Sequence, residues 1–130
     1  MFLQSGTYGG AHARYKAVDV TSQIESASPH RLIAILFEEL LKAIETMAAA
    51  QKLGNRAKMI DKQARASTIL LALETSLDYR NGGELALNLA QVYREGRRLI
   101  QQGGRTGSSD MVEQARAMLA EIADAWSQIG

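Results

Sequence analysis

Apolar residues recur every three or four positions along most of this chain, the spacing that gathers them on one side of an α-helix. No segment shows the alternation of apolar and polar residues that is typical of a half-buried strand. The pattern divides into four long amphipathic segments, over residues 29–52, 55–80, 84–102 and 110–129. Helices of these lengths with short connections predict an all-α protein, folded as an antiparallel up-down-up-down four-helix bundle.

The expected helix ends follow from capping residues and glycines. Ser28 suits the N-cap of the first long helix, and Pro29 suits its first turn, where a missing N–H costs nothing. Gly82 is expected to end the next helix in the left-handed conformation. Glu84 then lies in the first turn of the third helix, where a carboxylate meets the positive end of the dipole. Residues 101–110, which contain three glycines and two serines, are expected to form a flexible connector.

The N-terminal region lacks this regularity. Residues 1–14 are rich in glycine and small polar residues, and we expect a flexible segment there. Residues 15–24 suit a short, loosely held helix, which begins the helical domain expected over 15–130. Scattered apolar side chains would allow this region to cover an apolar groove of the bundle. The candidates for that role are Tyr8, Tyr15, Val18, Val20 and Ile24.

Two of the long helices carry more apolar residues than one buried face requires, and a third has one apolar residue outside its stripe. The residues beyond the main stripes are Ile33, Ile35, Phe37, Leu41, Ile60, Ala64, Leu71 and Leu87. This surplus predicts contact with the N-terminal region or with a second copy of the chain, or else a groove for an amphipathic segment of another protein. The pattern alone leaves these alternatives open.

Composition narrows the possible classes of function. A length of 130 residues suggests one domain, and 15 basic against 14 acidic residues give a net charge of +1, which provides no general attraction for nucleic acid or anionic membrane. There is no cysteine, neither histidine lies in a metal-binding or nucleophile pattern, and no apolar run approaches the ~20 residues that span a bilayer. The first residues do not resemble a secretory signal. We therefore expect no catalytic residues, metal, cofactor or membrane insertion, in a cytoplasmic protein.

Three arginines on one side of the third long helix raise the hypothesis of a small RNA-binding regulator. Arg94, Arg97 and Arg98 are spaced so that they could meet RNA phosphates. However, Glu95 interrupts the group, and no aromatic platform for stacking bases accompanies it. A solvated helix face explains these residues, and we expect no nucleic acid partner.

Several short motifs occur in a specific order along the chain. They are Tyr15 with Val18 and Val20, Ser28-Pro29-His30 with Leu32-Ile33, Leu36-Phe37-Glu38, Ser76-Leu77-Asp78 with Gly82-Gly83-Glu84, Asn88-Leu89 with Tyr93, and Ala125-Trp126. The set resembles the FliS family of flagellar secretion chaperones, and the resemblance covers residues 15–129 in order.

The resemblance implies a cytoplasmic chaperone that binds the disordered C-terminal segment of flagellin, delays its polymerisation and helps present it to the flagellar export gate. It implies no ATP. The surplus apolar residues would then be the surface that flagellin covers. The expected contact residues are Ile35, Phe37, Leu41, Ile60, Ala64, Leu71 and Leu87. The alternative is a homodimeric structural or regulatory bundle that buries the same surface against itself; a weak homodimer is compatible with either function.

Overall fold

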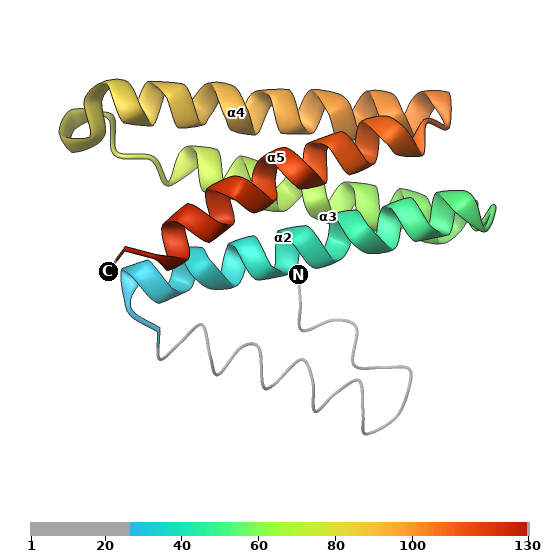
Figure 1. Cartoon of the computed structure of the whole chain (residues 1–130), viewed down its shortest axis with the longest axis horizontal. Helices are drawn as coiled ribbons and strands as arrows, with labels where there is room; N and C mark the ends of the chain where they lie inside the picture. The colour runs from blue at the N-terminus through green and yellow to red at the C-terminus, as the bar shows by residue number, and fades with distance from the viewer. Residues whose placement is uncertain (1–26, 130) are drawn as a thin grey trace. The chain divides into compact units, whose positions relative to one another are not determined.

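The structure, a computed structural model, describes residues 27–129 of the chain. It contains four α-helices in this range: α2 (Pro29–Lys52), α3 (Arg56–Thr75), α4 (Tyr79–Thr106) and α5 (Ser109–Ser127) (Figure 1). The all-α class is therefore confirmed. The N-terminal candidates Tyr8, Tyr15, Val18, Val20 and Ile24 lie outside the described residues.

The chain divides into two compact units, residues 1–35 and 36–130. The described part of the first unit contains the beginning of α2. Ser28 Oγ accepts a hydrogen bond from the backbone N–H of Arg31 at 3.1 Å, and the Ser28 carbonyl accepts one from Leu32 at 2.8 Å. These bonds satisfy N–H groups that have no partner within the helix, so the prediction of Ser28 as the N-cap is confirmed.

In the second unit, the remainder of α2 and the helices α3, α4 and α5 run in alternating directions, as an antiparallel bundle (Figure 1). Polar contacts join helices that are distant in sequence. Arg65 on α3 lies 2.9 Å from Glu39 on α2, and Gln51 on α2 donates to the carbonyl of Gly103 on α4 at 2.9 Å. The connections are short, so each helix returns beside the previous one, as predicted.

The core of this unit is apolar throughout. All four helices contribute large side chains that are almost completely buried, and no polar or charged residue among those described is buried. The largest of these side chains are Leu40, Ile44, Met47, Leu70, Leu73, Ile100, Val112 and Leu119. At roughly 1.5–3 kcal/mol for each such side chain removed from water, this burial is the main term that holds the helices together.

The turn between α3 and α4 does not lie where the sequence predicts it. The helix α3 ends at Thr75, not near Arg80, and Asp78 caps α4 by accepting hydrogen bonds from the N–H groups of Arg80 and Asn81, each at 3.1 Å. Gly82 therefore lies inside α4 and does not adopt a left-handed conformation. The irregular residue is Gly83, with φ 50° and ψ −124°, where α4 is kinked. The position of the turn is set by Asp78, which caps the start of α4, and not by Gly82, which was expected to end the preceding helix.

The prediction of a flexible connector over residues 101–110 is also wrong for most of that range. The helix α4 continues through Gly103 and Gly104 to Thr106, and only Gly107 takes a left-handed conformation, with φ 77°. Gly103 and Gly104 are buried, and a Cβ on either would collide with Val112 or Gln63, respectively. These two glycines permit close contact between helices. Ser108 then caps α5, and its Oγ accepts from the N–H of Met111.

Candidate apolar binding surface

One side of α3 presents apolar side chains to solvent. Ile60 is 50% exposed and Leu71 is 49% exposed, and Ala64 between them is also exposed. Their spacing of four and seven residues places them on one stripe of the helix. The opposite side of α3 is buried through Ala66, Ile69, Leu70 and Leu73. The helix thus has the two predicted apolar sectors, but only one has a neighbour among the described residues.

The beginning of α4 adds a second group of exposed apolar side chains. Leu87 is 56% exposed, which agrees with its predicted place outside the buried stripe. Leu85 is 65% exposed as well, because the buried side of α4 is turned towards Ala86 and Ala90. Small side chains at these two positions form the buried face, so the larger leucines remain outside. The hydrophobicity of the residues alone does not predict that the alanines are buried here and the leucines exposed.

Two predicted contact residues, Ile35 and Phe37, are not on the surface. Each is only 3% exposed, so the expectation that they form part of an open face is wrong. The Phe37 ring lies 6.4 Å from the ring of Tyr93, centroid to centroid, inside the bundle. Burial raises the pKa of Tyr93 to about 12, so this phenol stays neutral. Leu41 is partly buried.

Three basic residues near the middle of α4, Arg94, Arg97 and Arg98, are paired with carboxylates. Arg94 Nε lies 2.8 Å from Glu74 Oε2, and Arg97 Nη2 lies 3.3 Å from Glu74 Oε1. Arg98 binds Glu95 at 2.8 Å on its own helix. These pairs compensate much of the positive charge that RNA phosphates would need, which favours the interpretation as a solvated, ion-paired face.

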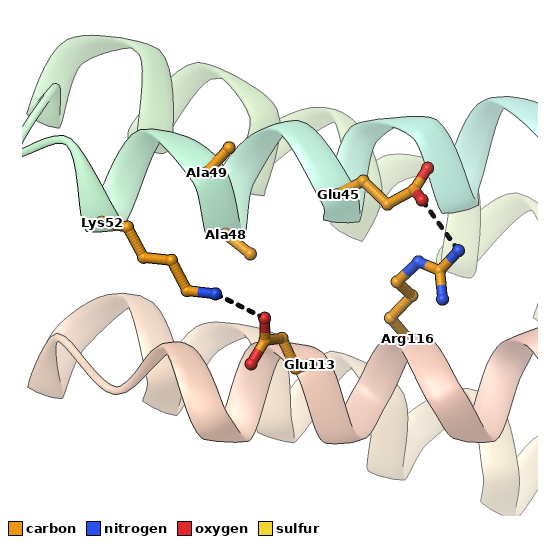
Figure 2. Close-up of a pocket in the computed structure, with 6 residues that line it drawn as sticks. All are labelled: Glu45, Ala48, Ala49, Lys52, Glu113 and Arg116. Carbon is orange, nitrogen blue, oxygen red and sulfur yellow. Dashed lines mark hydrogen bonds and ion pairs between the residues drawn. The ribbon is translucent and has the colours of Figure 1, made fainter.

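A shallow cleft of about 570 Å³ lies between α2 and α5 and is bridged by two ion pairs (Figure 2). Arg116 Nη2 lies 2.8 Å from Glu45 Oε1, and Lys52 Nζ lies 2.8 Å from Glu113 Oε1, over a floor that includes Ala48. The hydrogen bond with Glu113 raises the pKa of Lys52, so its amine remains protonated and is neither a base nor a nucleophile. The arrangement joins two helices and does not form an acid–base pair.

Within residues 27–129, no group of histidine, aspartate and glutamate side chains is arranged to hold a metal ion. None of the four helices in that range combines the length and apolarity that crossing a membrane requires.

The fold and the exposed stripe together define a class: a small helical bundle whose apolar surface is suited to bind another protein segment. Comparison with known proteins makes the assignment specific. Residues 11–130 match the family described as flagellar protein FliS. The chain therefore belongs to the FliS family.

The relatives of this chain are named in the same terms. It is 32% identical over 116 residues to the flagellar secretion chaperone FliS of Salmonella typhimurium, covering 88% of this chain and 86% of that one. It is 30% identical over 120 residues to the protein of that name from Vibrio cholerae, covering 92% and 88% of the two chains. For the Escherichia coli protein of that name, identity is 29% over 129 residues, covering 98% and 91%. This membership confirms the predicted family and its non-enzymatic chaperone class.

Proposed function

We propose that this protein is a cytoplasmic export chaperone that binds the C-terminal segment of flagellin, prevents its premature polymerisation and aids its delivery to the flagellar export gate. The observation that carries the proposal is the exposed apolar stripe of α3, formed by Ile60, Ala64 and Leu71. An amphipathic helix of the client would bury this stripe, as helices do in apolar grooves. Family membership supplies the choice of flagellin as the client.

The proposed site contains Ile60, Ala64 and Leu71 on α3, with Leu87 on α4 and partly buried Leu41 on α2 at its margins. Ile35 and Phe37 would contribute only if they became exposed on binding, because both are buried in the free chain. Binding would act by mass action, since a chaperone that captures the disordered form lowers its free concentration.

Calorimetry with a synthetic peptide of the C-terminal flagellin segment tests the proposal. Binding of about one peptide per chain is expected, with a negative heat-capacity change, because apolar surface of both partners leaves water. The matched control is the same peptide with its sequence scrambled. Flagellin would be rejected as the client if micromolar protein gave no heat of binding at two temperatures and a fluorescence titration also detected no binding of the peptide.

We also propose that the N-terminal segment covers the apolar groove in the absence of client, through Tyr8, Tyr15, Val18, Val20 and Ile24. Two features support this proposal: apolar side chains in a region of weak helical pattern, and an apolar stripe that would otherwise promote self-association. A cover of this kind would lower the apparent affinity for client by the fraction of molecules left open.

Deletion of residues 1–20 tests this second proposal. The truncated chain should bind the flagellin peptide severalfold more tightly and should associate or aggregate more readily without it. Light scattering and peptide titration on the same sample measure both effects. Weaker peptide binding by a folded truncated chain would instead place the N-terminal segment within the client site. Strong dimerisation with no peptide binding would favour the homodimeric alternative.

A further inference from the structure

A cavity of about 320 Å³ lies where α3 begins and α4 ends. Its lining includes Gln51, Asn55, Arg56, Gly104, Arg105 and Thr106, and it contains no acidic residue. The turn between α2 and α3 and the turn between α4 and α5 lie at this same end of the second unit (Figure 1). Arg56 and Arg105 are therefore the charged groups of the cavity, and both are cationic.

Neither arginine is paired within the described part of the chain. No hydrogen bond or ion pair joins the guanidinium group of Arg56 or of Arg105 to any residue of the range 27–129. This distinguishes them from Arg94, Arg97 and Arg98, which all bind carboxylates of the protein. The cavity thus carries uncompensated positive charge, while the Glu74 end of α3 is already neutralised.

The position of Arg56 makes this charge more unusual. It is the first residue of α3, and Lys58 follows two residues later, with no acidic residue in the first turn. Cations are unfavourable at the positive end of a helix dipole, where carboxylates are preferred. An incoming anion would interact favourably with both arginines and with this helix end.

One of the lining residues, Gln51, has an unsatisfied acceptor. Gln51 donates through Nε2 to the carbonyl of Gly103, and its Oε1 atom is buried with no hydrogen-bond partner among the described residues. A ligand that carries an N–H donor next to a negative charge would match both the two arginines and the unsatisfied Oε1 atom of Gln51. The last residue of a polypeptide has this chemistry, because its carboxylate and its backbone N–H are adjacent.

The cavity adjoins the exposed stripe of α3. Arg56 precedes Ile60 by four residues, or about one helical turn, so both lie on the same side of the helix. A client helix lying along Ile60, Ala64 and Leu71 would therefore have one end at the cavity. Its C-terminal end is the electrostatically suitable one, since that end of a helix carries partial negative charge.

We propose that Arg56 and Arg105 hold the terminal carboxylate of the client, so that the client helix runs antiparallel to α3 with its chain end in this cavity. The inference rests on the proposed function, because it takes the C-terminal segment of flagellin as the client. It adds a polarity to the complex and a requirement for a free chain end. The terminal carboxylate accepts hydrogen bonds from the two guanidinium groups.

The test compares two synthetic peptides of the flagellin C-terminal segment, identical except that one ends in a free carboxylate and the other in an amide. With the full-length protein, the free acid should bind about fivefold to tenfold more tightly, as expected for charge-assisted hydrogen bonds at a partly open site. The difference should shrink as salt concentration rises. In the Arg56→Gln/Arg105→Gln variant, the two peptides should bind with equal affinity.

The matched control is Arg80→Gln/Arg98→Gln, which removes the same charge from exposed positions that do not line the cavity. This variant should preserve the preference for the free acid. Equal binding of both peptides by the unaltered protein would overturn the carboxylate site while leaving flagellin as the client. A preference that survives in Arg56→Gln/Arg105→Gln would also overturn it. Failure of both peptides to bind would reject the proposed function, and the carboxylate site with it.

Discussion

Gly83 is the residue at which the backbone of α4 departs from helical geometry. Its φ of 50° and ψ of −124° belong to a region that side chains with a Cβ rarely occupy, although a Cβ there would meet no other atom within 4 Å. The constraint is therefore backbone strain and not lack of space. We expect Gly83→Ala to destabilise the fold by about 1–3 kcal/mol.

The matched control is Gly82→Ala, at the neighbouring position without a positive φ. An added Cβ at Gly82 would lie 3.0 Å from the Cβ of Ala86, so a smaller loss is expected there. Urea denaturation, monitored by circular dichroism, measures the stability of both variants. Equal stability of Gly83→Ala and the unaltered protein would show that the kink does not require glycine.

Gly103 illustrates a different use of the same residue type. Glycine inside a helix normally costs about 0.5–1 kcal/mol relative to alanine. Here a Cβ would lie 2.8 Å from Val112 Cγ2 on α5 and 3.0 Å from the carbonyl oxygen of Ser108. Gly103→Ala is therefore expected to destabilise the protein by about 1–3 kcal/mol through overpacking, despite the better helix propensity of alanine.

Gly96→Ala provides the comparison for this effect. Its added Cβ would lie 3.2 Å from Leu119 Cδ1, the end of a side chain, and would approach no backbone atom of another segment. We expect a distinctly smaller loss, measured by the same denaturation. A Gly103→Ala protein as stable as the unaltered one would mean that α4 and α5 separate easily at this point.

At the scale of the helix, the start of α4 depends on Asp78. Hydrogen bonds from the backbone and side chain of Asn81 outweigh the small effect of burial and hold the pKa of Asp78 below its usual range. Because the folded pKa is lower than the unfolded value, the carboxylate stabilises the fold above the unfolded pKa. That contribution is lost as the pH falls through the folded pKa.

The resulting prediction concerns Asp78→Ala. Its melting temperature should be lower than that of the unaltered protein at about pH 7, and the difference should diminish below about pH 4. Glu39 and Glu95 also have lowered pKa values, but they titrate in both proteins and cancel in the difference. Asp78→Asn, which retains an acceptor without a titrating proton, serves as the control. A difference that is independent of pH would show that the charge of Asp78 does not contribute.

At the scale of the whole molecule, folding and client binding are expected to use different apolar residues. Leu71→Glu and Leu87→Glu should leave the helix content unchanged and weaken binding of the flagellin peptide, because both side chains are about half exposed. Ile35→Glu should instead unfold the chain, since an uncompensated buried carboxylate costs several kcal/mol, on the order of 2–7. Circular dichroism and peptide titration on the same samples separate the two effects.

The control for added charge is Gln91→Glu, at an exposed position of α4. It should alter neither folding nor binding. Loss of helicity in both leucine variants would assign these positions to the core, whereas unchanged affinity in both would place the client elsewhere on the surface.

The helices themselves could be predicted from the sequence, because their signals are local. The period of the apolar residues predicted four helices, and Ser28 with Pro29 marked the start of α2 correctly. The ordered motifs were sufficient to indicate the family, and the second apolar sector of α3 was visible as Ile60, Ala64 and Leu71. The helix signals and the second sector of α3 each depend on residues within a few turns of one another.

The tertiary structure alone decided which apolar and glycine residues face a neighbour. Phe37 is buried against Tyr93, although the pattern predicted it on the binding surface, while the large side chain of Leu85 is exposed. Gly83 kinks α4, whereas Gly103 brings α4 close to α5, although a glycine pair in the sequence suggests a helix end at both places. The physical reason is that burial and close packing depend on atoms from other helices, and local periodicity contains no information about which side of a helix those atoms will cover.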